Sequence, residues 1–470
     1  MKTTEFKNCR VVRSSWLEEG GRRLDCNPYM SGALEARDAL RKLHCRKDKL
    51  VEVTLEMFDS GRESRTWVDD PMYGVRYMGS TAISLGDLST LPLISKKQTK
   101  RNQKLLIKSG WSLITRSGTI GRMAYARPDM DGLACSEDVL RVVPNSDIIP
   151  SGYLYAFLSS RFGVPLVVAG TYGAIIQHIE PSHIADLPVP RLGSDVEQRT
   201  HLFVQRAASA RAEAFVLRRN ARELLNVSLG FPEKLSFKSR DLSTASTNSS
   251  AVLSRMDATF HDSFAQRSDS FIGKTNAVST LHELGITSAE TGRLKQVFTE
   301  PEFGVPFYTS GEIFKSRLDA TRFLSRNLLK LNEDVLVKTG EILIARSGQV
   351  GGIIGRGVWA DSRFEKSCVS VDVLRLSARE SEIPAGYVFA FLCLTDIGYR
   401  QLIRGASGSS IPHLNANDVL GVKLPRCERK VESDIASLVE KSGELLAQAN
   451  DDENQAWGLI EGAIERNLNG

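Results

Sequence analysis

This 470-residue chain lacks the segments that would place it in or across a membrane. It contains no run of 18 apolar residues, and its start, MKTTEFKNCR, lacks the apolar stretch of a secretory signal. A membrane-spanning helix needs about 20 mostly apolar residues. These absences predict a soluble, cytoplasmic protein. At roughly 100–200 residues per domain, its length predicts two to four domains.

Cysteine is scarce and scattered. The seven cysteines include no C-x-x-C pair, and their number is odd. This argues against both a disulfide framework and a zinc site, which would need paired or closely spaced cysteines. We therefore expect no metal and no cofactor bound by this chain.

Complete catalytic motifs are missing as well. Asn27-Pro28-Tyr29 lacks one proline of the Asn-Pro-Pro-Tyr motif of adenine methyltransferases. Gly273-Lys274-Thr275 resembles part of a phosphate-binding loop, but position 268, where that loop needs glycine, is Ser. His178 and His413 occupy equivalent positions without a shared acid or nucleophile after them, so we interpret them as structural. These absences predict a non-catalytic protein.

The chain does contain a long internal repeat. LLIKSGWSLITRSGTIG (105–121) returns as VLVKTGEILIARSGQVG (335–351), and the neighbouring segments return in the same order. Further on, the pairs Gly170 and Gly405, Gly173 and Gly408, Ile176 and Ile411, and His178 and His413 keep a constant offset of 235. A period above 200 residues indicates a duplicated domain rather than a solenoid. Residues 113–116 and 342–346 are predicted strands that run into Ser-Gly turns, and 152–162 and 386–394 are predicted short buried helices.

Each copy ends in a predicted long helix. Apolar or small residues recur at spacings of four and three along both segments, which is typical of a coiled-coil seam. Ser442 and Asp452 are poor seam residues, and we expect the seam to be weakest there. Residues 194–226 carry a net charge of +2 and residues 428–466 carry −6. Opposite charge favours pairing of these two helices with each other, and the whole-chain charge of +5 leaves +9 for the other residues.

The predicted fold class is therefore mixed α/β (α+β), with two homologous globular domains joined by two long antiparallel coiled-coil helices. The polar stretch 234–250 reads as a flexible connector. The predicted boundaries are a first globular domain at 1–192, a helix at 193–230, a linker at 231–252, a second globular domain at 253–427 and a helix at 428–470.

The order of these elements resembles the specificity subunit of Type I restriction-modification systems. The resemblance lies in the two strand-turn strings, in SGYLYAFLSS and AGYVFAFLCL, and in IIQHIEPSHIADLPVPRL and SIPHLNANDVLGVKLPRC. Glu197-Gln198 at the head of the first helix also fits the family, whereas the second copy has Glu428-Arg429 after Pro425.

The resemblance implies a non-catalytic subunit with two target-recognition domains, each reading half of a split double-stranded DNA target. The helices would set the spacing and hold two methylation subunits. Restriction and translocation subunits would complete the complex. S-adenosylmethionine, ATP and Mg would bind to those partners.

The Ser-Gly turns are the first candidates for DNA contact, because glycine lets the backbone approach closely and arginine binds phosphate or guanine. Basic residues nearby are candidates for phosphate binding, and positions that differ between the copies are candidates for base reading. The predicted DNA-binding residues are Arg116, Ser117, Gly118, Thr119, Arg346, Ser347, Gly348, Gln349, Lys96, Lys97, Lys100, Arg101, Lys104, Lys108, Lys315, Arg317, Arg322, Arg326, Lys338, Tyr172 and Ser407.

Other functions stay open at this point. A DNA-recognition subunit of a related phage-defence methylation system would differ in its partners. A coiled-coil scaffold that binds protein, or an enzyme with an unrecognised site, belongs to another class. The positive charge outside the helices counts against a pure protein scaffold.

Overall fold

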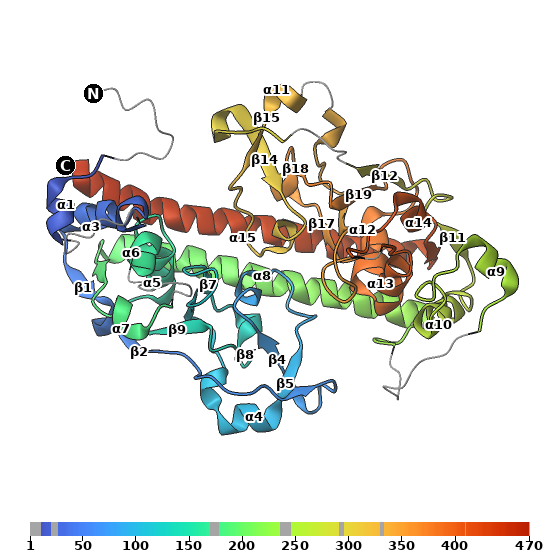
Figure 1. Ribbon diagram of the computed structural model, residues 1–470, viewed down its shortest axis with the longest axis horizontal. Helices are drawn as coiled ribbons and strands as arrows, with labels where there is room; N and C mark the ends of the chain where they lie inside the picture. The colour runs from blue at the N-terminus through green and yellow to red at the C-terminus, as the bar shows by residue number, and fades with distance from the viewer. Residues whose placement is uncertain are drawn as a thin grey trace. The chain divides into compact units, whose positions relative to one another are not determined.

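The computed structural model describes residues 11–19, 27–169, 178–235, 246–290, 296–329, 333–408 and 410–469. Helices and short strands alternate along the chain, which confirms the mixed α/β class (Figure 1). The chain divides into two compact units. Unit 1 contains residues 1–212 and 448–470, and unit 2 contains residues 213–447.

Unit 1 contains two four-stranded sheets, with the orders β2-β9-β6-β7 and β3-β5-β4-β8, and the two-stranded pair β1-β10. Its strands are β1 (Lys47–Lys49), β2 (Thr54–Phe58), β3 (Trp67–Val68), β4 (Gly74–Met78), β5 (Leu93–Ser95), β6 (Ser112–Thr115), β7 (Met123–Tyr125), β8 (Ala134–Cys135), β9 (Val139–Pro144) and β10 (Pro188–Pro190). Only the pairing of β4 with β8 is parallel.

Unit 2 repeats this arrangement in the same sequence order, with sheets β12-β19-β16-β17 and β13-β15-β14-β18 and the pair β11-β20. Its strands are β11 (Val278–Thr280), β12 (Thr287–Glu290), β13 (Phe298–Thr299), β14 (Gly304–Tyr308), β15 (Phe323–Ser325), β16 (Ile342–Ala345), β17 (Gly357–Trp359), β18 (Cys368–Val369), β19 (Val373–Ser377) and β20 (Lys423–Pro425). The predicted strands before the two Ser-Gly turns are confirmed as β6 and β16.

Short helices precede and separate the strands along each unit. Those of unit 1 are α1 (Ser14–Glu19), α2 (Asn27–Met30), α3 (Ala33–Lys42), α4 (Lys96–Arg101), α5 (Ser151–Leu158), α6 (Gly163–Ala169) and α7 (Pro181–Ile184), with 3-10 turns η1 (Leu50–Glu52), η2 (Ala82–Ser84), η3 (Gln103–Leu105) and η4 (Pro128–Met130). Those of unit 2 are α9 (Ser249–Ser254), α10 (Ser263–Ile272), α11 (Arg326–Leu329), α12 (Ala385–Phe389), α13 (Asp396–Ile403) and α14 (Ala416–Leu420), with 3-10 turns η5 (Pro301–Phe303), η6 (Glu312–Phe314), η7 (Glu333–Val335) and η8 (Ser362–Phe364), and the π-helix η9 (Ala390–Leu394).

The two predicted buried helices are confirmed as α5 and as α12 with η9. Residues 152–158 of α5 are all buried, as are residues 386–389 of α12 and 390–392 of η9. Among the described residues, no single helix is long and apolar enough to cross a membrane. The pair α5 and α6 passes that test only together, across a 70° bend.

Two long helices, α8 (Ser194–Leu229) and α15 (Arg429–Asn469), each contribute to both units. In unit 1, Val204 and Ala208 of α8 and Ile460 of α15 join one core cluster with α5. In unit 2, Leu225 of α8 and Ile435 of α15 join the core around α12. The early part of α8 thus packs in the same unit as the late part of α15.

The two polar seam positions are hydrogen-bonded in the structure. Nε of Arg218 donates to Oγ of Ser442 over 3.1 Å in unit 2, and Arg206 forms an ion pair with Asp452 in unit 1. Beside the latter pair, Arg211 Nη2 lies 2.7 Å from Glu453 Oε2, with both side chains buried. The sequence predicts a weak seam here. The structure instead supplies each polar residue with an arginine from α8, because α8 is basic and α15 acidic.

A buried clasp joins the last strand of each unit to the long helix that follows it. In unit 1, Arg191 pairs with Glu197 over 2.8 Å. In unit 2, Arg426 pairs with Glu432 over 2.7 Å. Glu432 is therefore the counterpart of Glu197, so pairing Glu197 with Glu428 was wrong. Pro190 and Pro425 are 235 residues apart, and so are Glu197 and Glu432. The glutamate at this offset is the one that pairs with Arg426.

Candidate nucleic-acid interface

Both Ser-Gly turns depend on the backbone freedom of glycine. Gly118 has φ +72° and Gly348 has φ +139°, a region that side-chain-bearing residues rarely adopt. Nothing lies within 4 Å of the position that a Cβ of Gly118 would occupy. The Gly118 position is therefore not crowded by the described residues.

The glycine that closes the turn is Gly121 in unit 1 and Gly355 in unit 2. The amide of Gly121 donates to the carbonyl of Thr115, and that of Gly355 to the carbonyl of Ala345. A Cβ would collide with Val168 at the first position and with Ile403 at the second. The repeated SGxxG string pairs Gly121 with Gly351, and this prediction was wrong. The equivalent backbone hydrogen bonds show that Gly355 is the counterpart of Gly121.

The turn of unit 2 is consequently longer by four residues. It contains Gln349, which is exposed, and Val350 and Ile353, whose exposed fractions are 57% and 37%. Its residues 347–354 carry no charge. The two units thus share the base of the turn and differ at its exposed tip.

The arginines that open the turns are bound within their own units. Arg116 has an exposed side-chain fraction of only 15%, because it pairs with Asp59 over 2.9 Å and with Glu180. Arg346 Nη1 lies 2.7 Å from Glu290 Oε2, at the end of β12. Both arginines connect the turn to the neighbouring strand, so their geometry is that of residues that position the turn.

The remaining turn candidates come together most clearly in unit 2. Ser347 Oγ lies 2.7 Å from Nδ1 of His413, and Ser407 pairs with His413 through two backbone hydrogen bonds. Nε2 of Gln349 donates to the carbonyl of Ser410 over 3.2 Å. The turn therefore lies against residues 407 and 410–413. In unit 1, Ser117 bonds to Asp138, Thr119 is exposed, and Tyr172, Gly170, Gly173 and Ile176 lie outside the described residues.

The basic residues of unit 1 lie on and beside α4, which follows β5 in the other sheet. Arg101 is held by Glu63 over 2.8 Å, Lys104 lies 3.8 Å from Glu56, and Lys96 donates to the carbonyl of Met72. Burial would raise the pKa of Glu63, but hydrogen bonds from Arg101 and Asn102 outweigh this and hold that pKa below its ordinary value. Lys97, Lys100 and Lys108 are exposed and have no ion-pair partner among the described residues.

Residues 59–63, which follow β2, contact both α4 and the arginine that opens the turn. Asp59 binds Arg116 and Glu63 binds Arg101. Four residues of extended chain span at most about 14 Å, so the two acids lie within that distance of each other. One short segment, residues 59–63, thus contacts both the arginine that opens the turn and the last residue of α4.

The corresponding basic residues of unit 2 are mostly paired. Arg322 lies 3.0 Å and Lys315 3.7 Å from Glu312, Arg317 pairs with Asp319, and Arg326 donates to the carbonyl of Gly304. Burial would raise the pKa of Glu312, but hydrogen bonds from Thr309 and Arg322 hold it below its ordinary value. Lys338 is half-buried and has no ion-pair partner in the described part of the chain.

The two partial motifs fall at positions that do not suit their chemistry. Gly273 and Lys274 follow the C-terminal end of α10, whereas a phosphate-binding loop precedes a helix and uses its N-terminal amides. Asn27-Pro28-Tyr29 opens the four-residue helix α2. In the described residues, no three His, Cys, Asp or Glu side chains gather as a metal site.

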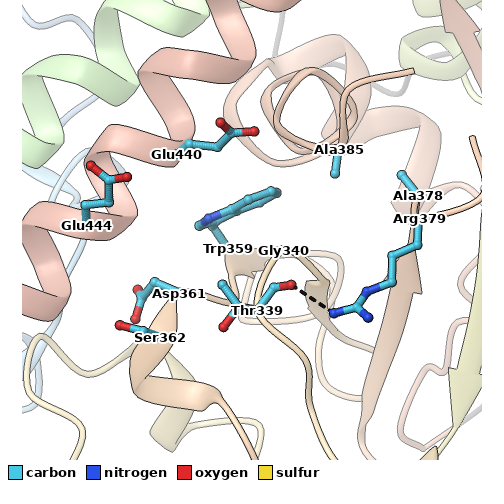
Figure 2. A pocket seen from close by; sticks show the side chains of 10 residues that line it. All are labelled: Thr339, Gly340, Trp359, Asp361, Ser362, Ala378, Arg379, Ala385, Glu440 and Glu444. Carbon is cyan, nitrogen blue, oxygen red and sulfur yellow. Dashed lines mark hydrogen bonds between the residues drawn. The ribbon is translucent and has the colours of Figure 1, made fainter. Parts of the chain in front are cut away.

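Unit 2 also contains a cavity of about 420 Å³ beside α15. Figure 2 shows Glu440 and Glu444 of α15 on one side of the Trp359 indole and Arg379 on the other, with Asp361 below. Gly443 allows the indole to lie against the helix, because a Cβ there would come within 2.8 Å of it. Carboxylates repel phosphate, so this cavity is not a candidate for DNA contact.

Comparison with known proteins gives structural matches alone. No protein-family model and no curated protein matches the chain. The Type-I restriction-modification system S subunit from M. genitalium is 12% identical, with a TM-score of 0.35 over 91% of this chain and 95% of that one. The HsdS subunit from Thermoanaerobacter tengcongensis is 14% identical, with a TM-score of 0.27 over 90% and 96%.

The chain is similar to Type I specificity subunits. A third structure, which concerns complex assembly and conformational transition of the type I R-M system, is 14% identical, with a TM-score of 0.28 over 90% of this chain and 97% of that one. The superpositions on these S subunits are loose over the full length.

Sequence reasoning missed the exposed apolar residues at the tip of unit 2. Val350 and Ile353 lie in the four extra residues of the turn, and Ile411 follows Ser410. The signal that could have found them is Gly355-Arg356, which repeats Gly121-Arg122 after the insertion.

Proposed function

We propose that this chain is the DNA-recognition subunit of a Type I restriction-modification complex, with each unit reading one half of a bipartite target. The observation that carries this proposal is the turn after β6 and β16. It is built twice on the same strand order, has the same glycine-dependent base, and differs at its exposed tip. A shared base with a variable tip suits two modules that read different sequences.

Contact with phosphates falls to the exposed lysines rather than to the ion-paired arginines of the turns. Lys97, Lys100 and Lys108 are unpaired among the described residues and lie on or near α4. Sequence-independent attraction of this kind orients a protein on a duplex, and contacts to base edges supply specificity. Arg116 and Arg346 act by holding the turns in position.

The long helices set the spacing between the two half-sites and dock two methylation subunits. α15 carries most of the negative charge of the helices, and the cavity at Glu440 and Glu444 adds an acidic surface to it. Methyl transfer, ATP use and DNA cleavage belong to methylation and restriction subunits that carry S-adenosylmethionine, ATP and Mg, in the cytoplasm. A related phage-defence methylation system would use the same recognition surfaces with other partners.

Methylation mapping tests this proposal. Adenine methylation is mapped by long-read sequencing in cells that carry the chain with its methyltransferase, and in matched cells that lack only the chain. A split motif that disappears with the chain supports the proposal. Unchanged methylation, with the methyltransferase shown to be expressed, contradicts it and favours a protein scaffold.

A further inference from the structure

The tip of unit 2 carries exposed apolar side chains on two segments, 347–354 and 410–412, that contain no charged residue. Val350 and Ile411 have exposed fractions of 57% and 55%. Each is next in sequence to a partner of the hydrogen bond between Gln349 and Ser410, so the two apolar residues lie on neighbouring segments. Ser347 and His413 join the same two segments at their base.

The two segments of this tip differ in composition from a phosphate-binding surface, and Arg356, which borders them, donates Nε to the carbonyl of Gly352 over 2.8 Å. Residues 347–354 and 410–412 include no lysine or arginine, and phosphate contact relies on such cations. The side chains at the tip are aliphatic groups, hydroxyls and one carboxamide. These are the groups that read base edges in the major groove, where a carboxamide pairs with adenine and an apolar group contacts the methyl of thymine.

We infer that the tip of unit 2 reads at least one A·T base pair in the major groove, with Val350 or Ile411 against the thymine methyl and Gln349 beside the adenine. The inference rests on the proposed function and names the base that this unit recognises. The turn of unit 1 lacks these four residues. One residue lies between Thr119 and Gly121, whereas five lie between Gln349 and Gly355.

Removing the thymine methyl tests this directly. The chain, assembled with its methylation subunits, is titrated with duplexes that carry the mapped target, in which thymines are replaced by deoxyuridine one half-site at a time. Deoxyuridine keeps base pairing and the minor groove and loses only the major-groove methyl. Loss of one buried methyl weakens binding by about three- to five-fold, and we expect this in one half-site.

Protein variants show whether the tip is responsible. Val350→Ala and Ile411→Ala remove exposed side chains, so folding is retained. In one of these variants, the thymine and deoxyuridine duplexes should bind with equal affinity in the sensitive half-site, while the other half-site is unaffected. Val227→Ala is the matched control, because Val227 is an exposed valine on α8 and its loss should leave the sensitivity to deoxyuridine unchanged.

The failure of this inference is distinct from failure of the proposed function. If no half-site contains thymine, or if target binding is specific but the effect of deoxyuridine persists in both variants, the inference is overturned while DNA recognition stands. If deoxyuridine has no effect in either half-site, the same conclusion follows. Absence of any target-specific binding overturns the proposed function itself.

Discussion

Arg426 Nε lies 2.7 Å from Oε1 of Glu432, and its Nη2 lies 2.9 Å from Oε2, so the guanidinium grips the carboxylate with two parallel hydrogen bonds. Glu432 is completely buried. The pair joins β20 to the first turn of α15, as Arg191 and Glu197 join β10 to α8. In each unit the ion pair thus holds the last strand against the first turn of the helix that follows it.

Removing this carboxylate should destabilise the protein. In Glu432→Ala, Arg426 loses its carboxylate partner, and loss of one partner of a fully buried ion pair costs roughly 3–5 kcal/mol. Because Arg426 is partly exposed and can be rehydrated, we expect about 2–3 kcal/mol, measured by chemical unfolding. Glu428→Ala is the control, since Glu428 is exposed and should have little effect. Equal unfolding curves for the two variants would contradict a role for the clasp.

His201 should make the stability of unit 1 dependent on pH. The amide of Gly152 donates to its Nδ1 over 3.0 Å, and burial lowers its pKa below the ordinary value of 6.5. Because the pKa of His201 is lower in the folded protein than in the unfolded chain, its contribution to the free energy of unfolding is complete above pH 6.5. This contribution is lost as the pH falls toward the pKa of His201 in the folded protein. Thermal unfolding between pH 7.5 and 5 should show this loss in the native protein.

The His201→Ala variant should lose that component of the pH dependence. Unit 2 already has Ala436 against Gly386 at the matching joint, so alanine fits this kind of packing. His282→Ala serves as the control, because His282 is exposed and its removal should leave the pH profile as it was. An unchanged profile in His201→Ala would assign the pH dependence to other groups.

Exchange of Lys97 and Lys100 for glutamine should weaken DNA binding and its dependence on salt. Each lost phosphate contact reduces the slope of log affinity against log salt by about 0.9, so we expect a decrease of about two. Titrations of a labelled duplex at several salt concentrations measure it. Glutamine at Lys234 and Lys441, two other exposed lysines, is the control. If the slope stays constant in the α4 variant, these lysines do not contact phosphate.

Lengthening both long helices should lengthen the unread spacer of the target. Seven residues inserted after Ala212 in α8 and after Ala447 in α15 add about 10.5 Å at roughly 1.5 Å per residue. At roughly 3.4 Å per base pair, the mapped motif should gain about three unread base pairs. Insertion in one helix alone is the control, because it breaks the seam. A motif with the original spacer in the double insertion would reject the helices as a ruler.

Several features of the fold could be predicted from local sequence. The 3–4 spacing and the charges of α8 and α15 are visible in the sequence, and the repeated string marks β6, β16 and their turns. The residue-by-residue alignment of the two copies after the turn was harder to predict, because the pattern SGxxG occurs at 117–121 and again at 347–351. Only backbone pairing with Thr115 and Ala345 shows that Gly355 is the counterpart of Gly121.

The ion pairs of the turn arginines could not be predicted. Arg116 is neutralised by Asp59 and Glu180, which are far from it in sequence and come close only after the sheet has formed. Its exposed appearance in the sequence, at the end of a strand and before a Ser-Gly turn, is the same as that of a free DNA-binding arginine. Tertiary pairing therefore decides which basic residues stay available for a ligand.

The shared use of α8 and α15 has a consequence for synthesis on the ribosome. Unit 2 is built from the continuous segment 213–447, whereas the core of unit 1 includes Ala456, Ile460 and Ile464. Although most of unit 1 is translated first, that core stays open until these residues emerge. The half of the protein that is made earlier is thus the half that is completed later, and a truncation before residue 456 should expose the apolar surface of α5.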